Sequence, residues 1–374
     1  MSTFAQISYN IHSNFTNYGS ALQSWALSQS ILKLGHRPVL VDYCPDCLKD
    51  MNPLNPIKHM WDTDEESRRM CELSLPAINI NWHKFDDFYT KQFYRTKKLY
   101  IKENFEELVD DEKIDGFVCG SDTIFCIDEF GFDDGYYANY PCMKNGYSIS
   151  YAASFGDSHF NEETYEILNK RLNNFKALGI RESWMIPYIR EHYMSHVCKV
   201  LDPTLLLTKE DFDKIADPKC LIEGKYLLLY ARRYNKLMFE FADKLAKANG
   251  WEVVDISLRA TNSDHHRMFY EAGVEEFLSL VKNAEFIVTN SFHGLIMSVQ
   301  YRRPFVVFSR EQCDIKIDEV LNLFDLSDRK LITGNEVVAN YIDYENVHKH
   351  IEDARVSSFS FLNKALSNCK LFQK

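Results

Sequence analysis

Short apolar runs alternate with helical patterns along this chain, and this alternation constrains the fold more than any other feature of the sequence. In the first half, the apolar runs have the length of buried strands and cover residues 4–9, 38–43, 115–120, 147–155 and 197–201. A helical pattern over 21–34 separates the first two runs, and Gly35 follows it at the position where glycine often ends a helix. A strand, a helix and a second strand in this order predict a parallel sheet.

The second half of the chain repeats the same pattern. Strands are predicted at 226–231, 252–256, 285–289 and 305–308, and helices at 236–249, 274–283 and 295–301. A polar stretch that contains Pro218 separates the halves, and 374 residues are too many for one small core. We therefore predict an α/β fold with an N-terminal domain over 1–207 and a C-terminal domain over 208–374, which face each other across a cleft.

Two segments do not follow the alternation. Residues 45–105 contain several prolines and many aromatic and charged residues, and they predict an insertion of short helices in the first domain. Whether this insertion forms a lid over the cleft stays open. Residues 346–370 predict a helix that packs back on the first domain.

Net charge and motifs exclude several classes of function. The formal net charge is −11, which is not the electrostatic pattern of a nucleic-acid-binding protein. The sequence has no Walker loop and no Gly-x-Gly-x-x-Gly turn, which disfavours NTP and dinucleotide chemistry. It has no window of roughly 18 uninterrupted apolar residues, and residues 1–30 show no secretory signal pattern. We expect a cytoplasmic protein, able to work at the inner face of the membrane, with no integral membrane segment and no nucleic-acid partner.

The cysteines and histidines do not predict a metal centre. Ten cysteines in a cytoplasmic protein are expected to be mostly reduced thiols. Cys44 and Cys47 have the spacing of half a zinc site or of a redox pair, but no second matched pair follows, and metal binding there stays open. His265 and His266 lie in a polar stretch and are interpreted as surface residues.

The strongest candidate for a site is the segment 286–294, which reads FIVTNSFHG. An apolar strand ends here in a polar turn and a helix begins at once, so free N–H groups are available for a phosphate or carboxylate. Asn290 and Ser291 are candidate substrate ligands, and Ser291 also suits a helix cap. His293 lies at the same mouth, where an imidazole can donate a proton. A serine that only caps and a histidine that only stabilises the turn explain the same spacing equally well.

Two further turns carry candidate residues. Asn17 and Gly19 precede the first helix, where glycine permits close backbone approach and asparagine offers an amide or caps the helix. Ser121 and Asp122 follow the strand at 115–120, and Asp122 either accepts a proton from a sugar hydroxyl or caps a helix. In both turns the structural alternative is the more common one.

Arginines near strand ends are candidates for holding an anion, because a guanidinium group binds carboxylate and phosphate through a two-pronged fork. The candidates are Arg181, Arg232, Arg233 and Arg310. Arg181 and Arg232 fall where residues of the cleft are expected. Most arginines are nevertheless solvated surface residues, so each of the four carries little weight alone.

Six segments, taken in order, resemble the polysaccharide pyruvyl transferase family over roughly residues 5–330. They are NYGSALQSWAL at 17–27, GSD at 120–122, SYAASFG at 150–156, IRE at 180–182, LDPTL at 201–205 and NAEFIVTNSFHG at 283–294. The chain departs from the family pattern after the GSD turn, where Thr123 and Phe125 stand in place of the usual Gln and Trp. This departure bears on the contacts to the acceptor.

The resemblance implies two Rossmann-like domains similar to those of B-type glycosyltransferases, with the acceptor on the N-terminal domain and the donor on the C-terminal domain. It implies phosphoenolpyruvate as donor substrate, a cell-surface glycan or its lipid-linked precursor as acceptor, and no cofactor. It also implies that His293 is the general acid and that arginines, Arg181 among them, hold the donor. In the expected mechanism His293 protonates the methylene carbon, sugar hydroxyls attack the neighbouring carbon, phosphate leaves and a cyclic ketal closes, while Asp122 orients or deprotonates the acceptor.

Two alternatives stay open. A nucleotide-sugar glycosyltransferase has the same architecture, although the sequence shows no clear acidic ligand for a ribose. A non-catalytic protein that binds a sugar or an anion is the other, and the changes at Thr123 and Phe125 leave room for it. Heat stability with phosphoenolpyruvate against nucleoside diphosphates tests the first alternative. Phosphate release with a panel of galactosides and mannosides tests the second.

Overall fold

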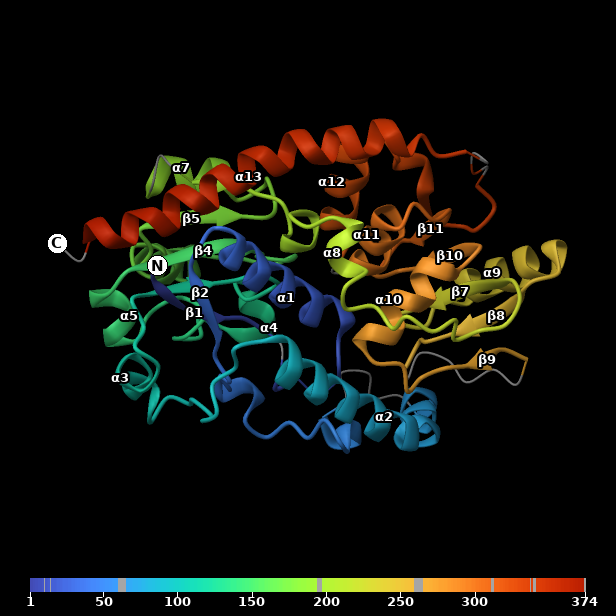
Figure 1. The fold of residues 1–374 in the computed structure, drawn as a ribbon, viewed down its shortest axis with the longest axis horizontal. Coiled ribbons are helices and arrows are strands. Elements are labelled where there is room, and N and C mark those ends of the chain that lie inside the picture. Colours follow the sequence, from blue (N-terminus) through green and yellow to red (C-terminus); the bar gives the residue numbers. More distant parts are fainter. Residues whose placement is uncertain are drawn as a thin grey trace.

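Two parallel sheets of six strands each form the framework of this protein (Figure 1). The computed structural model describes residues 1–374 except 10, 14, 60–64, 194–196, 259–264, 311–312, 337, 339–340 and 373–374. The first sheet has the order β2-β1-β3-β4-β5-β6 and the second the order β12-β11-β10-β7-β8-β9. The predicted α/β fold with two Rossmann-like domains is therefore confirmed.

The strands are short, and most begin or end within a few residues of the predicted positions, whereas the strands at 177–180, 267–268 and 330–331 were not predicted. In the first sheet they are β1 (Thr3–Ile7), β2 (Arg37–Leu40), β3 (Gly116–Cys119), β4 (Ser148–Ala153), β5 (Ala177–Ile180) and β6 (Cys198–Lys199). In the second sheet they are β7 (Tyr226–Tyr230), β8 (Glu252–Asp255), β9 (Arg267–Met268), β10 (Phe286–Thr289), β11 (Phe305–Phe308) and β12 (Lys330–Leu331). Most of their residues are buried, as expected for parallel strands covered on both faces, whereas the edge strands β6 and β9 contain no buried residue.

The helices cover the faces of both sheets. They are α1 (Tyr18–Lys33), α2 (Glu65–Gln92), α3 (Leu108–Glu112), α4 (Ile127–Phe130), α5 (Pro141–Asn145), α6 (Glu162–Leu172), α7 (Ile186–His192), α8 (Lys209–Phe212), α9 (Lys236–Asn249), α10 (Val274–Asn283), α11 (Phe292–Gln300), α12 (Asp314–Phe324) and α13 (Tyr344–Phe372). Short 3₁₀ turns occupy η1 (Asp46–Leu48), η2 (Pro56–His59), η3 (Phe105–Glu107), η4 (Pro203–Leu205) and η5 (Ser327–Arg329).

Each sheet has one point where the strand order reverses. In the first sheet β2 and β3 lie on opposite sides of β1, and in the second β8 and β10 lie on opposite sides of β7. Loops that leave such neighbouring strands diverge to opposite faces of the sheet and leave a crevice at its carboxyl edge. The two reversal points therefore indicate where each domain would contribute to a site.

The predicted insertion of short helices is wrong for residues 65–92, which form the single helix α2 with Pro76 inside it. Proline removes one backbone donor from a helix, which argues for a break at this position. Ile78, Phe85 and Phe88 are nonetheless buried, at a spacing that places them along one side of the helix. The two phenylalanines join a core cluster with residues of both domains, and this packing outweighs the missing hydrogen bond.

The last helix, α13, runs along both domains at the top of Figure 1. Ile351 packs in a cluster of mainly second-domain residues, whereas Leu362 and Leu366 pack with residues of the first sheet. The Tyr147 hydroxyl donates a hydrogen bond to the Ala365 carbonyl over 2.7 Å. One continuous helix thus connects the outer layers of both domains.

Helix α1 forms a second junction between the domains. The Tyr18 ring stacks on Phe277 of α10 with centroids 4.4 Å apart. Its hydroxyl donates a hydrogen bond of 2.7 Å to the carbonyl of Ala272, which also accepts from the side chain of Asn81 on α2. This contact ties the first helix of the chain to the second domain.

We expect Tyr18→Phe to lower the free energy of unfolding by about 1 kcal/mol, because one buried hydrogen bond is lost while the Ala272 carbonyl keeps its other donor. Urea denaturation measures this change. The matched control is Tyr234→Phe, since Tyr234 is 56% exposed. A loss in Tyr18→Phe no larger than in the control would show that the hydroxyl adds nothing to the junction.

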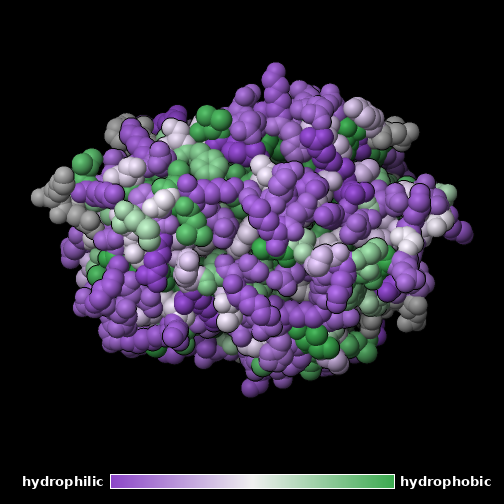
Figure 2. Space-filling view, viewed as in Figure 1, coloured by the Kyte–Doolittle hydropathy of each residue, from purple (hydrophilic) through white to green (hydrophobic). Residues whose placement is uncertain are grey.

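The face shown in Figure 2 is largely hydrophilic, with small apolar patches scattered over it. Among the described residues, no helix combines the length and the apolar character that crossing a bilayer requires.

Candidate functional site

A cavity of about 260 Å³ lies where loops from the carboxyl ends of both sheets meet. The segments after β1, β3, β7 and β11 contribute Tyr9, Asp122, Arg232 and Arg310 to its wall. The strand order reverses between β1 and β3 in the first sheet and between β7 and β10 in the second, and β11 is the neighbour of β10. The cavity therefore occupies the place where open α/β sheets bind their ligands.

The charges on the wall are divided between the domains. The second domain supplies the four cations Arg232, Arg233, Arg310 and Lys316. The first domain supplies two carboxylates, which are Asp122 and Glu129. This is the local concentration of positive charge that an acidic protein needs in order to bind an anion.

Arg310 has donor capacity left for a ligand. Its Nε atom is buried and has no hydrogen-bond partner among the residues that the structure describes. Its backbone N–H donates to Asp314, which fixes the loop in front of α12. A buried cationic donor without a partner costs free energy, and a bound carboxylate or phosphate would satisfy it.

Glu129 and Asp122 differ in their surroundings. Burial raises the pKa of Glu129 above its ordinary value of 4.5, and the attraction of the nearby Lys316 opposes this only in part. Thr123 donates a hydrogen bond to Glu129 over 3.1 Å. Asp122 has a positive φ of 74°, and its two oxygens accept from the Ser20 hydroxyl at 2.5 Å and the Thr123 N–H at 2.9 Å. Glu129 is thus the wall carboxyl that binds a proton more readily than an ordinary glutamate.

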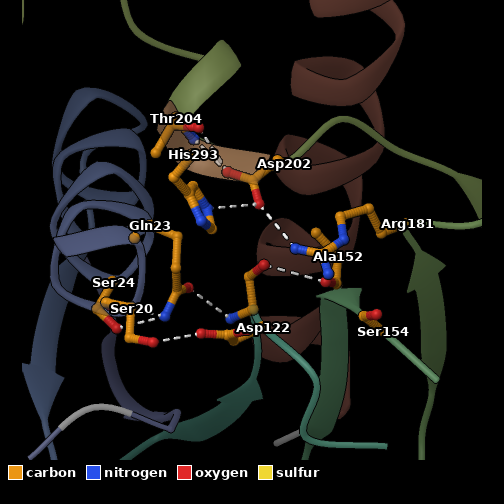
Figure 3. Close-up of polar contacts among 12 residues, drawn as sticks. Ser20, Gln23, Ser24, Asp122, Ala152, Ser154, Arg181, Asp202, Thr204 and His293 are labelled. Atoms are coloured by element: carbon orange, nitrogen blue, oxygen red, sulfur yellow. Dashed lines mark hydrogen bonds and ion pairs between the residues drawn. The ribbon is translucent and has the colours of Figure 1, made fainter. Parts of the chain in front are cut away.

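A polar network lies beside the cavity, and all six segments that resemble the pyruvyl transferase family contribute to it (Figure 3). The Gln23 side chain accepts from the Ser121 N–H at 3.0 Å and donates to the Ser8 hydroxyl at 2.8 Å. The Ser121 hydroxyl donates to the Ala152 carbonyl over 3.0 Å. These contacts hold the turn that presents Asp122 to the cavity.

The centre of this network is Asp202, which lies between Arg181 and His293 (Figure 3). Its Oδ2 atom is 3.0 Å from Arg181 Nη1 and 3.3 Å from His293 Nε2. Burial disfavours the charged carboxyl, but His293 and Arg181 outweigh it and hold the pKa of Asp202 well below its usual range. Because His293 belongs to α11 and Asp202 to the first domain, this ion pair joins the two domains.

His293 does not occupy the position expected for a group that faces the donor. It is 7% exposed and is not among the residues that line the cavity. A Cβ atom at Gly19 would lie 2.0 Å from its Nδ1 atom, so the ring packs directly on the backbone of α1. The sequence correctly placed His293 at the turn that follows β10, but it could not show that Gly19 and Asp202 pack around the imidazole ring.

Four more of the predicted ligands have polar groups engaged by the protein, although the buried Nη2 atom of Arg181 has no hydrogen-bond partner among the described residues. Arg181 is 5% exposed and pairs with Glu182 and Asp202 rather than facing the cavity. Ser121 is fully buried in the network. Ser291 caps α11 by accepting from the Gly294 N–H.

Asn290 is the fourth predicted ligand whose polar groups are engaged by the protein. Its side-chain oxygen accepts from the Arg232 N–H at 2.7 Å, and its side-chain nitrogen donates to the Arg233 carbonyl at 2.8 Å. Asn290 therefore braces the loop after β7. It positions the two arginines for the cavity instead of binding the ligand itself.

Of the predicted ligands, Asn17, Asp122, Arg232 and Arg310 lie on the wall of the cavity. Asn17 also caps α1 by accepting from the Gly19 N–H. Sequence reasoning missed Glu129 and Lys316. Glu129 follows the GSD turn by seven residues with no motif of its own, and Lys316 belongs to α12, a helix that was not predicted.

The departures from the family pattern have different surroundings. Thr123 lies on the cavity wall, where it contacts Glu129. Phe125 is fully buried and stacks on Tyr137 with centroids 4.6 Å apart, so the change at this position affects the core.

Cys44 and Cys47 are free thiols, the first buried and the second exposed. Burial raises the pKa of the Cys44 thiol to about 11. Among the described residues, neither joins a group of three potential metal ligands.

Comparisons with known proteins identify the family and the fold. A family model described as polysaccharide pyruvyl transferase matches residues 17–312. A search of curated proteins found no match. A structure from Listeria monocytogenes, assigned as a UDP-N-acetylglucosamine 2-epimerase, has 11% identity and a TM-score of 0.51, and the match covers 97% of this chain and 90% of that one.

Two further similar structures are a UDP-GlcNAc 2-epimerase from Neisseria meningitidis and the glycosyltransferase SnogD from Streptomyces nogalater. The first has 10% identity over 99% of this chain and 100% of that one, with a TM-score of 0.49. The second has 11% identity over 100% of this chain and 99% of that one, with a TM-score of 0.40. The likeness to the Listeria monocytogenes structure, at 11% identity, concerns the fold alone.

Proposed function

The chain belongs to the polysaccharide pyruvyl transferase family, and we propose that it transfers the pyruvyl group of phosphoenolpyruvate to two hydroxyl groups of a sugar, forming a cyclic ketal. The acceptor would be a cell-surface polysaccharide or its precursor. The observation that carries the proposal is the cavity between the domains, in which four cations of the second domain face two carboxylates of the first.

The size and charge of the cavity suit a small polyanion. Its volume of about 260 Å³ is below the range of typical pockets for drug-sized ligands. Phosphoenolpyruvate presents a phosphate and a carboxylate, and the arginines and Lys316 can bind both groups. The donor would thus lie on the second domain, and the sugar would approach from the side of Asp122.

We assign the proton donor to Glu129 instead of His293, because Glu129 lies on the cavity wall and has a raised pKa. Its proton passes to the methylene carbon of the donor, and positive charge develops at the carbon that bears the phosphate. Arg310 and Lys316 stabilise the anionic groups of the donor while this happens. His293 then acts as a positioning residue, since it packs on Gly19, whose N–H is held by the Asn17 cap.

The remaining steps balance without another reactant. One sugar hydroxyl adds to the cationic carbon, and Asp122 takes its proton or passes it to the Glu129 carboxylate. The carbon–oxygen bond to phosphate then breaks, and the second hydroxyl adds in its place. Its proton leaves with the phosphate, so the products are the ketal and inorganic phosphate.

The donor is tested by ligand-dependent heat stability and by phosphate release. We expect phosphoenolpyruvate to raise the melting temperature more than UDP or other nucleoside diphosphates do, because a ligand that binds the native state stabilises it. Phosphate release in the presence of galactosides or mannosides would then identify the acceptor class. Stabilisation by nucleoside diphosphates alone would overturn the proposed donor. The absence of phosphate release with every acceptor of a broad panel would favour a non-catalytic binding protein.

Arg310→Gln is expected to raise the Kd for phosphoenolpyruvate roughly 10- to 100-fold, since a charge-assisted hydrogen bond contributes about 1.5–3 kcal/mol. The fold should be retained, because the Nε atom that the substitution removes has no hydrogen-bond partner among the described residues. Calorimetric titration measures the affinity, and Arg302→Gln is the matched control because Arg302 pairs with Glu345 at the surface. Equal affinities of both variants would remove Arg310 from the donor site.

A further inference from the structure

Away from the cavity, Asp243, His265 and His266 bring three potential metal-ligating side chains together. One ligand atom from each lies within 4.8 Å of the others. Among the described residues, this is the only such group of three potential metal ligands. Asp243 lies on α9, and the two histidines directly precede β9. None of the three lines the cavity.

Two of the separations can be compared with those of a tetrahedral site, and each involves a different carboxylate oxygen of Asp243. His266 Nε2 lies 2.7 Å from Asp243 Oδ1, and His265 Nε2 lies 3.3 Å from Asp243 Oδ2. Zinc binds histidine nitrogen and carboxylate oxygen at about 2.0–2.2 Å, which places neighbouring tetrahedral ligands roughly 3.3 Å apart. The His265 separation matches this value, whereas the His266 separation is shorter, so His266 and Asp243 would have to move slightly apart to admit the ion.

A fourth residue supports His266 from its other side. The His266 Nδ1 atom is 3.6 Å from Oδ2 of Asp255, which is fully buried at the end of β8. Among the described residues, neither of these two buried atoms has a hydrogen-bond partner. Asp255 is itself held by the Ser257 N–H, which donates to Oδ1 over 2.7 Å.

At 3.6 Å this pair is longer than a hydrogen bond, and a slightly closer approach would give the arrangement that fixes a metal-bound imidazole. A histidine that binds a metal through one nitrogen usually donates the other N–H to a carboxylate, which sets its tautomer and orientation. The side chain of His266 is 1% exposed, so the expectation that it is a surface residue is wrong, whereas the His265 side chain is 69% exposed. The buried position of His266 is explained if it is a ligand.

We propose that Asp243, His265 and His266 bind a zinc ion, with Asp255 orienting His266 and water completing the coordination. The exposed sides of Asp243 and His265 give the ion access from solvent. Bound zinc would fasten the segment before β9 to α9. The site is structural and lies apart from the proposed chemistry of pyruvyl transfer.

The competing explanation is a charged His266 that bridges two carboxylates without any metal. Burial lowers the pKa of its imidazole, but Asp255 and Asp243 outweigh this and raise it. Zinc has to displace that proton in order to bind, so affinity should increase with pH. The two explanations differ in whether zinc stabilises the protein.

The test is a titration of the metal-stripped full chain with zinc chloride, followed by calorimetry and melting temperature. We expect one zinc ion per chain at this site and a rise in melting temperature of about 2 °C or more. His265→Ala and Asp243→Asn should abolish the rise, and Asp255→Asn should weaken binding about 10- to 100-fold. The matched control is His159→Ala, which removes a surface histidine paired with Asp128 and should keep the full response.

Two results would overturn the proposal. One is a wild-type protein whose melting temperature does not respond to zinc, which would leave His266 as a bridging imidazolium. The other is a zinc response of equal size in His265→Ala, which would place the ion elsewhere, such as at exposed cysteines.

Discussion

Glu129→Gln is expected to lower the rate of phosphate release from phosphoenolpyruvate and acceptor by roughly 10²–10⁴-fold, the usual contribution of a general acid. Glutamine keeps the size of the side chain and a hydrogen-bonding oxygen for Thr123, but it cannot deliver a proton to the methylene carbon. The KM for the donor should stay the same or fall, because a negative charge leaves a cavity that binds an anion. Steady-state phosphate release measures both quantities.

The matched control lies one residue away on the same short helix. Asp128 pairs with His159 at the surface, so Asp128→Asn should leave turnover unchanged. If Glu129→Gln keeps turnover within about two-fold of the wild type, Glu129 is not the proton donor.

The pH profile separates Glu129 from His293. A protonated glutamic acid is required for the first step, so the wild-type rate should fall as pH rises through a pKa above 4.5. This fall should be absent from the residual activity of Glu129→Gln and present in His293→Gln, whose main effect should be on donor KM through the α1 backbone. Loss of the same pH-dependence in His293→Gln, with Glu129→Gln nearly as active as wild type, would return the acid role to the imidazole.

Asp202→Asn is expected to lower the free energy of unfolding by about 3–5 kcal/mol, the usual cost of removing one partner from a buried ion pair. Arg181 would keep only Glu182 as its carboxylate partner, and His293 would lose its ion pair across the domains. Urea denaturation at pH 7 measures the change. Asp87→Asn is the control, because its exposed pair with Lys91 should contribute less than about 1 kcal/mol.

The effect of Asp202 should also depend on pH in a defined direction. Its pKa is lowered in the folded protein, so its stabilising contribution is present above the unfolded value of about 3.9 and is lost as pH falls towards the folded value. The difference between wild type and Asp202→Asn should therefore be constant near neutral pH and shrink below about pH 4. A difference that does not change on acidification would show that the carboxylate charge is not the source of the stability.

The sequence predicted the fold well because most of the buried strands form short apolar runs that alternate with helical patterns. The helices at 236–249 and 274–283 begin and end as predicted, and so does the strand at 305–308. Helix α11 begins at Phe292 instead of Leu295, since Ser291 caps it one turn earlier. Helix α2 was missed because Pro76 suggested a break, and its buried stripe depends on contacts with both domains.

The candidate site was predicted less completely, for a physical reason. Motif residues such as Ser121, Arg181 and Asn290 stand at strand ends, as expected, but their polar groups hold the neighbouring loops. Which polar groups remain available to a ligand depends on partners far apart in the sequence. Lys316 and Glu129 reach the cavity from opposite domains, a proximity that no local pattern encodes.

The continuous helix α13 has a consequence for how substrates reach the site. Proteins built from two lobes can admit ligands by opening on a hinge, but here the single helix α13 packs on both lobes, and the stacked Tyr18 forms a second contact between them. A wide opening between the lobes would require α13 to bend or to separate from one of them. We therefore expect the donor to enter and phosphate to leave through the existing opening of the cavity, with rearrangement confined to side chains and surface loops.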